Sequence, residues 1–250
     1  MPFDRWLRRQ PLAHRALSMA QAVLSKLKGP SWNDTFDVLR RYNLTPKTIF
    51  DIGVARGTPR LYAAFPDAAY HLIDPTHESL PFMKDIAKRY NARVYNVALG
   101  AQEGTFPIIV REGIGASSFY TDVADPSYVK RYDVPVVPFD KLIAKFARPA
   151  LAKIDVQGAE MLVLEGMASR LRDLDAIIIE ISTITTLHEG PELREVVRFF
   201  ACYNWSLADV MSTTRRPLDG ALAQLDLLFV PDTSPLRSDN RWEVGPAQAA

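Results

Sequence analysis

The feature of this sequence that most constrains its fold is a regular alternation of short apolar runs with helical segments after residue 47. Apolar, β-branched runs predict buried parallel strands, because a strand covered on both faces does not alternate polar with apolar residues. The predicted elements are strand 48–54, helix 58–65, strand 70–74, helix 79–90 and strand 93–99. This β-α-β-α-β order predicts a doubly wound α/β sheet.

The alternation resumes beyond residue 100 after a less regular stretch. Residues 111–133 contain few periodic signals, and loops of that length in compact domains are often functional or mobile. Strand 176–181 is very apolar, which predicts a central place in the sheet. The other expected elements are strands 105–110 and 134–137, helix 139–146, strand 151–155, helix 160–171, which Gly166 could break, helix 191–203 and strands 205–210 and 225–230.

Length and composition favour a single domain. A chain of 250 residues, 48% of them hydrophobic, suits one large α/β domain with a short extension. We expect this domain over residues 30–232, between a basic amphipathic helix at 1–29 and a polar tail at 233–250. A basic amphipathic helix can lie on an anionic membrane surface, pack on its own domain or bind a partner.

Charge and cysteine content argue against several classes of protein. Lys and Arg total 30 against 29 Asp and Glu, whereas a protein that binds nucleic acid usually has a clearer basic excess. The single cysteine, Cys202, cannot form an intramolecular disulfide, and we expect it to pack in the core. No apolar run approaches the ~20 residues of a membrane span. We therefore expect a cytoplasmic protein, with peripheral membrane contact through the N-terminal helix as the alternative.

Residues 50–57 read Phe-Asp-Ile-Gly-Val-Ala-Arg-Gly and predict a strand, a glycine-bearing turn and the start of a helix. Gly53 lets the backbone turn and approach a ligand, and Gly57 opens a helix whose free N–H groups suit an anion. Asp74, about 20 residues later, can accept both hydroxyls of a ribose or cap the next helix. NAD sites usually have glycine where Ala55 stands, so the pattern favours S-adenosylmethionine over NAD.

Two further acidic residues end buried strands of the predicted sheet. Asp155 ends strand 151–155, and Glu180 lies at the end of the next strand along the chain. Because the carboxyl ends of parallel strands meet at the edge where ligands bind, we expect both carboxylates beside a cofactor cleft. His188 lies in the loop after that strand, and the ordinary alternative for it is a surface histidine.

With these motifs in order, the chain resembles the FkbM family of methyltransferases over roughly residues 47–180. The family has Asn where Ala55 stands, and Glu-Pro where Asp74-Pro75 stands; the second change keeps the carboxylate, while the first removes a polar contact. The matching segments are residues 50–57, Ile73-Asp-Pro75, Asn96-Val-Ala-Leu-Gly100, Ser117-Ser118, Pro138-Phe-Asp140, Lys153-Ile-Asp-Val-Gln-Gly-Ala-Glu160 and Ile179-Glu180.

The resemblance implies a Rossmann-like sheet of the class I methyltransferase type, mostly parallel with an antiparallel strand near the C-terminus. It implies S-adenosylmethionine as donor and O-methylation of a hydroxyl on a sugar, glycan or related natural product. The cofactor-binding residues that it implies are Asp51, Gly53 and Gly57 at the methionine end with Arg56 beside them, Asp74 at the ribose, Ala98 near adenine, and Ser117, Ser118 and Asp155 at the transfer site.

For such a transfer the enzyme must orient a hydroxyl and remove its proton. The candidate bases are Asp155 first, Glu180 second and His188 third. A metal-assisted version stays open, because carboxylates are hard oxygen ligands. Two other functions stay open as well: an NAD-dependent oxidoreductase or epimerase, and a non-catalytic scaffold in glycan assembly. The acceptor is not encoded in a pattern we can read, although we expect specificity in residues 111–133 and after Glu180.

Overall fold

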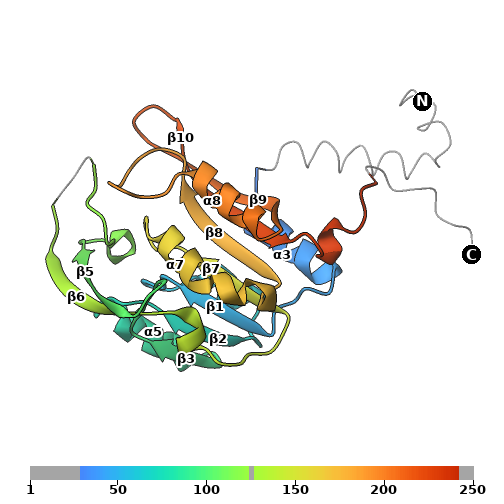
Figure 1. Ribbon diagram of the computed structural model, residues 1–250, viewed down its shortest axis with the longest axis horizontal. Helices are drawn as coiled ribbons and strands as arrows, with labels where there is room; N and C mark the ends of the chain where they lie inside the picture. The colour runs from blue at the N-terminus through green and yellow to red at the C-terminus, as the bar shows by residue number, and fades with distance from the viewer. Residues whose placement is uncertain (1–28, 124–126, 242–250) are drawn as a thin grey trace, which may run out of the picture.

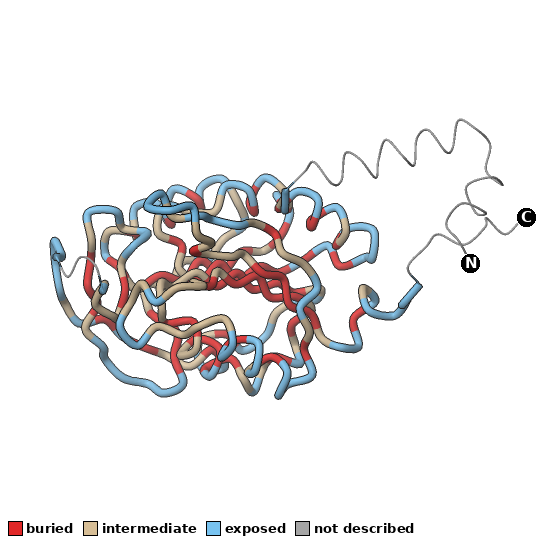
Figure 2. Tube along the Cα trace, turned by 90° about the horizontal axis from the view of Figure 1, so that it is seen from above, coloured by how far each residue is buried: buried red, intermediate tan, exposed pale blue. Residues whose placement is uncertain are grey.

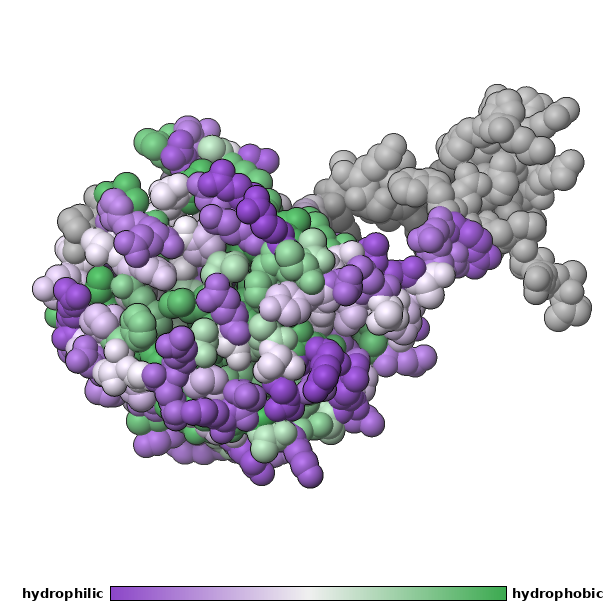
Figure 3. All heavy atoms as spheres, viewed as in Figure 1, coloured by the Kyte–Doolittle hydropathy of each residue, from purple (hydrophilic) through white to green (hydrophobic). Residues whose placement is uncertain are grey.

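The computed structural model describes residues 29–123 and 127–241. The predicted N-terminal helix, up to residue 28, and the last nine residues of the predicted tail lie outside the described residues. No helix in the described part of the chain is long and apolar enough to cross a membrane. On the face seen in Figure 3, hydrophilic and hydrophobic residues are interspersed.

A seven-stranded sheet forms the centre of the molecule, with strand order β3-β2-β1-β7-β8-β10-β9 (Figure 1). The five neighbouring strands β3, β2, β1, β7 and β8 are parallel, and β10 pairs antiparallel with both β8 and β9. The expected doubly wound, mostly parallel sheet with an antiparallel strand near the C-terminus is therefore confirmed. The strands are β1 (Thr48–Ile52), β2 (Ala69–Ile73), β3 (Ala92–Tyr95), β7 (Ala150–Ile154), β8 (Ala176–Ser182), β9 (Trp205–Arg215) and β10 (Leu222–Pro231).

Helices cover both faces of this sheet, because successive side chains of a buried strand point to opposite faces. In β1, Ile49 packs toward α3, α4 and α5, whereas Phe50 and Ile52 pack toward α6, α7 and α8. Figure 2 shows the result as a buried central layer with exposed segments around it. The helices are α3 (Trp32–Arg41), α4 (Pro59–Ala64), α5 (Leu80–Ala87), α6 (Phe139–Leu142), α7 (Glu160–Met167) and α8 (Leu193–Cys202).

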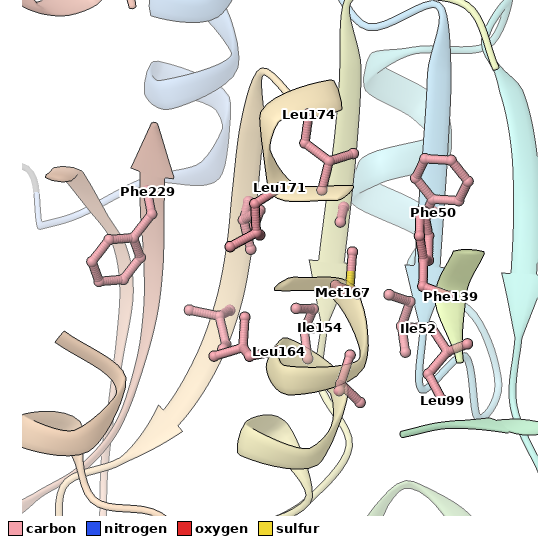
Figure 4. Close-up of a cluster of buried hydrophobic side chains, with 14 of the residues drawn as sticks. Phe50, Ile52, Leu99, Phe139, Ile154, Leu164, Met167, Leu171, Leu174 and Phe229 are labelled. Carbon is pink, nitrogen blue, oxygen red and sulfur yellow. The ribbon is translucent and has the colours of Figure 1, made fainter. Parts of the chain in front are cut away.

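The core on the α7 side explains why this helix continues past its glycine. Leu164 and Met167 point from α7 toward Ile154 of β7 (Figure 4). A Cβ on Gly166 would lie 2.3 Å from the carbonyl oxygen of Gly100, so only glycine allows this approach. The α-helix runs through Gly166 to Met167, where a 3₁₀ segment, η2 (Ala168–Asp173), follows it. The suggested interruption of helix 160–171 therefore lies one residue after Gly166, and the glycine itself permits the close packing against Gly100.

A second, three-stranded sheet in the order β4-β6-β5 lies beside the main one. It consists of β4 (Ala98–Leu99), β5 (Gly104–Val110) and β6 (Lys130–Val137). The single strand expected at 93–99 is wrong, because it is divided between the two sheets. Asn96 marks the division: its side-chain amide donates to the carbonyl oxygens of Asp74 and Thr76, which turns the chain away from β3.

Three other expectations differ from the structure. The predicted loop 111–133 is shorter than expected, because β6 begins at Lys130 and η1 (Ile114–Ala116) and a bridge between Ile109 and Ser118 order its first part. Cys202 is exposed rather than buried, since it lies at the end of α8 on the helix face away from the sheet. The strands β9 and β10 are also longer than their apolar centres indicate, because they pair with each other as a hairpin.

Candidate active site

A cavity of about 420 Å³ opens at the carboxyl ends of the central strands. It lies where the strand order reverses between β1 and β7, which is where open α/β sheets bind ligands. Its walls come from both sheets and from the starts of α3 and α4. The predicted site residues that line it are Gly53, Arg56, Gly57, Asp74, Ala98, Ser117, Ser118, Asp155 and Glu180.

The turn after β1 requires Gly53 for the backbone conformation that the sequence predicted, and also for a close contact that the sequence did not predict. Gly53 has a φ of 79°, and a Cβ there would lie 1.8 Å from the carbonyl oxygen of Asp155. The backbone of Asp155 is held at this place because its N–H donates to the carbonyl oxygen of Ile52 at 3.0 Å. The glycine therefore permits the close approach of the ends of β1 and β7 at the floor of the cavity.

Gly57 does not open a helix as expected. Its φ of 102° belongs to the turn, and its N–H donates to the carbonyl oxygen of Val54 at 2.6 Å. The helix α4 begins two residues later at Pro59, which has no N–H to offer a ligand. The predicted helix start is thus moved from Gly57 to Pro59, and Thr58, Pro59 and Arg60 at this start line the cavity.

Asp51 lies below the cavity and does not line it. Its carboxylate is fully buried, accepts hydrogen bonds from Thr58 Oγ1 and Tyr62 Oη, and lies 3.8 Å from Lys153 Nζ. Burial raises the pKa of Asp51, and the charge of Lys153 opposes that effect. These bonds fix the turn into α4, so the structure does not bring Asp51 to the methionine end of a bound donor.

Asp74 fixes the start of the next helix and also lines the cavity. Oδ1 accepts from the Thr76 N–H and hydroxyl and from the Ser79 hydroxyl, at 2.7–2.8 Å, which fixes the start of α5. Oδ2 accepts from the Ala55 N–H at 2.8 Å. An ionised carboxylate oxygen has a further acceptor position, so Oδ2 can still take a ribose hydroxyl from the cavity that Asp74 lines.

Ala55 has a strained backbone, with a φ of 48°. This left-handed conformation costs an L-residue roughly 1–2 kcal/mol and suits Gly or Asn better. We expect Ala55→Gly to raise the free energy of unfolding by about 0.5–1 kcal/mol, because part of the gain is lost to the freer unfolded chain. Urea unfolding measures it, with Ala201→Gly in the exposed part of α8 as a control that should destabilise. A destabilised Ala55→Gly would show that the turn is not strained.

The loop after β7 connects two of the predicted acidic residues. Lys153 Nζ donates to Asp155 Oδ2 at 2.9 Å, so this carboxylate is charge-paired. The side-chain amide of Gln157 donates to Asp155 Oδ1 at 2.7 Å and to Glu180 Oε1 at 3.0 Å. Gln157 itself has a φ of 51°, and the Ser118 hydroxyl donates to its carbonyl oxygen at 2.5 Å.

Glu180 differs from Asp155 in its electrostatic surroundings. Burial, followed by the negative charges of Asp155 and Asp226, raises the pKa of Glu180 to about 7. Hydrogen bonds from Gln157 and Gln224 hold its Oε1. A carboxylate with a pKa near the working pH is suited to accept and release a proton, and Glu180 fits this role better than the charge-paired Asp155.

The remaining predicted residues fall into two groups. Ala98, Arg56 and Ser117 line the cavity, with the Arg56 guanidinium 5.8 Å from the centre of the Phe82 ring. His188 is exposed and lies outside the cavity lining, and its backbone N–H donates to the carbonyl oxygen of Thr121. The structure therefore does not bring the third candidate base to the other two.

A family model described as the methyltransferase FkbM domain matches residues 51–206. The chain belongs to the FkbM methyltransferase family. No curated protein gives a significant match to its sequence. The matched residues include the turn after β1, the loop after β7 and all of β8, which together supply most of the cavity floor.

Solved methyltransferase structures are similar to this FkbM methyltransferase. One is the 1,6-didemethyltoxoflavin-N1-methyltransferase of Burkholderia thailandensis, with 1,6-didemethyltoxoflavin and S-adenosylhomocysteine bound. The two chains are 13% identical in sequence, the match covers 78% of this chain and 76% of that chain, and the TM-score is 0.44. Another is the magnesium protoporphyrin IX methyltransferase of Synechocystis PCC 6803, with S-adenosylmethionine bound: 14% identity, 92% and 90% coverage, TM-score 0.44.

The cofactor of this methyltransferase is S-adenosylmethionine, and the cavity residues fit it. Asp74 offers an acceptor to ribose hydroxyls, and the apolar side chains of Val97, Leu99 and Ile108 near Ala98 suit an adenine ring. The carboxylate of Asp155 lies at the level of the turn after β1, where a positively charged donor group is favoured. The described residues contain no group of three or more His, Cys, Asp or Glu side chains that could hold a metal ion.

Four residues that carry or bind carboxyl groups of the cavity were not predicted as site residues from the sequence. Lys153 and Gln157 stand in the most distinctive motif, yet their partners become visible only in three dimensions. Asp226 interrupts the apolar run of β10, which is a signal that could have been followed. Trp32 stands at the start of α3, far from any motif, and no signal in the sequence points to it.

Proposed function

We propose that this methyltransferase transfers its methyl group to a hydroxyl oxygen on a sugar, glycan or related natural product. The observation that carries this proposal is Glu180, a carboxylate in the cavity wall whose pKa is raised to about 7. A hydroxyl must lose its proton as the methyl group arrives, so a base near neutrality in the cavity favours a hydroxyl acceptor.

The residues around the cavity divide the work of this reaction. S-adenosylmethionine supplies an already activated methyl group on a sulfonium. Lys153 and Gln157 hold Asp155 in place, and Asp155 orients the donor through its negative charge. Glu180 takes the proton of the acceptor hydroxyl, because one of its oxygens is free of protein donors in the described residues. Orientation of this kind contributes a large part of the rate in such displacements.

A labelled-methyl assay tests the proposal. The full chain is incubated with S-adenosylmethionine carrying a ¹³C methyl group and with a panel of methyl glycosides, nucleotide sugars, phenols and amines. We expect mass spectrometry to find a single methyl group added to a hydroxylated acceptor, with the ¹³C chemical shift of a methyl ether. A methyl group found only on nitrogen or carbon would contradict the proposal, as would the absence of product with every hydroxylated class.

A further inference from the structure

Two carboxylates face each other across neighbouring strands of the cavity wall. Glu180 in β8 and Asp226 in β10 are direct partners in the antiparallel register. Side chains of direct partners lie on the same face of a sheet, with Cβ atoms about 4.5–5.5 Å apart. Both residues line the cavity, so their carboxyl groups are neighbours in one site.

Each carboxyl group is held by the protein through one oxygen only. Glu180 Oε1 accepts from the side-chain amides of Gln157 and Gln224, each at 3.0 Å. Asp226 Oδ2 accepts from Trp32 Nε1 at 3.0 Å and from the Ser212 hydroxyl. Within residues 29–123 and 127–241, no donor reaches Glu180 Oε2 or Asp226 Oδ1. The pair therefore presents two fixed acceptor oxygens that lack a protein partner.

This arrangement destabilises the folded protein when both carboxyl groups are ionised. Like charges placed directly opposite each other in a sheet are destabilising. The nearest cation, Lys153, is bonded to Asp155 rather than to either member of the pair. Carboxylate oxygens only accept hydrogen bonds, so a ligand that satisfies both must bring two donors close together.

We propose that Glu180 and Asp226 form the acceptor subsite and together bind two neighbouring hydroxyls of one substrate, a vicinal diol such as a sugar ring carries. This inference rests on the proposed O-methylation and specifies its substrate class. Glu180 receives the hydroxyl that becomes methylated, and Asp226 binds the neighbouring hydroxyl and fixes which one reacts. A substrate with one isolated hydroxyl can use only half of the subsite.

In the transfer step the two residues have different roles. The acceptor oxygen forms a bond to the methyl carbon while the carbon–sulfur bond breaks, and the electron pair of the broken bond stays on the sulfur. The hydroxyl proton passes to Glu180 Oε2. Asp226 keeps its hydrogen bond to the neighbouring hydroxyl throughout and exchanges no proton.

Trp32 fixes one member of the pair. It is buried against Phe36 at the edge of the cavity, and its indole N–H donates to Asp226, which holds this carboxyl group in one orientation. Trp32 and Asp226 both lie outside the residues matched by the family model, 51–206. Asp226, which binds the neighbouring hydroxyl, and its partner Trp32 thus come from β10 and α3, outside the matched residues, whereas Glu180 lies within them.

The pairing of the two carboxyl groups can be tested without turnover, through the pKa of Glu180. The charged groups that face Glu180 are Lys153 from β7, Asp155 from the loop after β7 and Asp226 from β10. The Asp226 carboxylate raises the pKa of Glu180, so Asp226→Asn should lower that pKa. Asp209→Asn on the neighbouring β9 is the matched control, because Asp209 is outside the cavity lining and should leave Glu180 unchanged.

The experiment follows the Glu180 carboxyl carbon by NMR in the full chain labelled with ¹³C at glutamate side chains, assigned by its loss in Glu180→Gln. The pH titration of wild type, Asp226→Asn and Asp209→Asn tests the pairing. Methyl α-D-mannopyranoside and methyl α-D-glucopyranoside are then added as diol probes, with cyclohexanol as the single-hydroxyl control. We expect a glycoside to shift the Glu180 signal in wild type and not in Asp226→Asn, and cyclohexanol to shift neither.

Three results would overturn the inference: an unchanged pKa of Glu180 in Asp226→Asn, no shift with either glycoside, or the same shift with cyclohexanol. A shift produced by Mg²⁺ and lost in Asp226→Asn would identify the pair as a cation site instead. These readouts are separate from methyl transfer. If the labelled-methyl assay fails while the glycoside shift is present, the subsite binds diols and the proposed O-methylation is wrong.

Discussion

Glu180→Gln should lower turnover by about 10²–10⁴-fold, the usual contribution of a positioned base. The substitution keeps the shape of the side chain and its amide partners within reach, but it removes the only candidate base with a pKa near 7 and a free oxygen among the described cavity residues. Donor binding should change little, because Glu180 belongs to the acceptor side of the cavity. Steady-state kinetics with the acceptor found in the labelled-methyl assay, together with calorimetric donor titration, measures both effects.

The pH dependence gives the same prediction a direction. In the wild type, kcat/KM should rise as pH increases through about 7, because Glu180 must lose its proton before it can act as a base. This rise should be absent in Glu180→Gln, and Glu165→Gln on the exposed side of α7 should keep the wild-type profile. Full turnover in Glu180→Gln, with loss in Asp155→Asn, would return the role of base to Asp155.

Gly53→Ala should have the second large effect, on stability and donor binding together. The new Cβ would lie 1.8 Å from the Asp155 carbonyl oxygen, in a turn whose φ of 79° an alanine rarely adopts. Overpacking and left-handed strain together cost about 2–5 kcal/mol. Either the ends of β1 and β7 move apart, which deforms the cavity floor, or the domain unfolds at a much lower denaturant concentration.

Urea unfolding and donor titration check this prediction. Gly113→Ala is the matched control, because nothing lies within 4 Å of its Cβ position and its φ is −83°. We expect the control to behave like the wild type. A Gly53→Ala protein with wild-type stability and donor affinity would mean that the two strand ends are not in close contact.

The strands of the main sheet could be predicted from the sequence because burial on both faces leaves a plain signal. The runs that became β1, β2, β7 and β8 are almost entirely apolar, and each was found within a residue or two of its ends. The division of 93–99 between two sheets could not be predicted, because it depends on Asn96 bonding to carbonyl oxygens of a loop distant in sequence. The exposed tip of the β9–β10 hairpin gave no apolar signal at all.

The position of the candidate site could be predicted from the sequence, but the roles of its individual residues could not. Strand ends identified Asp74, Asp155 and Glu180 as residues of one edge, and the structure brings all three to one cavity. Sequence could not show that the oxygens of Asp51 are bonded to Thr58 and Tyr62, nor that Lys153 forms an ion pair with Asp155. Those contacts depend on side-chain geometry, and they decide which carboxylates are free to act.

Every role given to the cavity residues depends on the cofactor, so the decisive measurement is a calorimetric titration of the full chain with S-adenosylmethionine, with NAD titrated in parallel. We expect one molecule of S-adenosylmethionine to bind per chain with micromolar affinity, and NAD to give no heat of binding. Binding of NAD, or no binding of S-adenosylmethionine by a folded sample, would contradict this expectation.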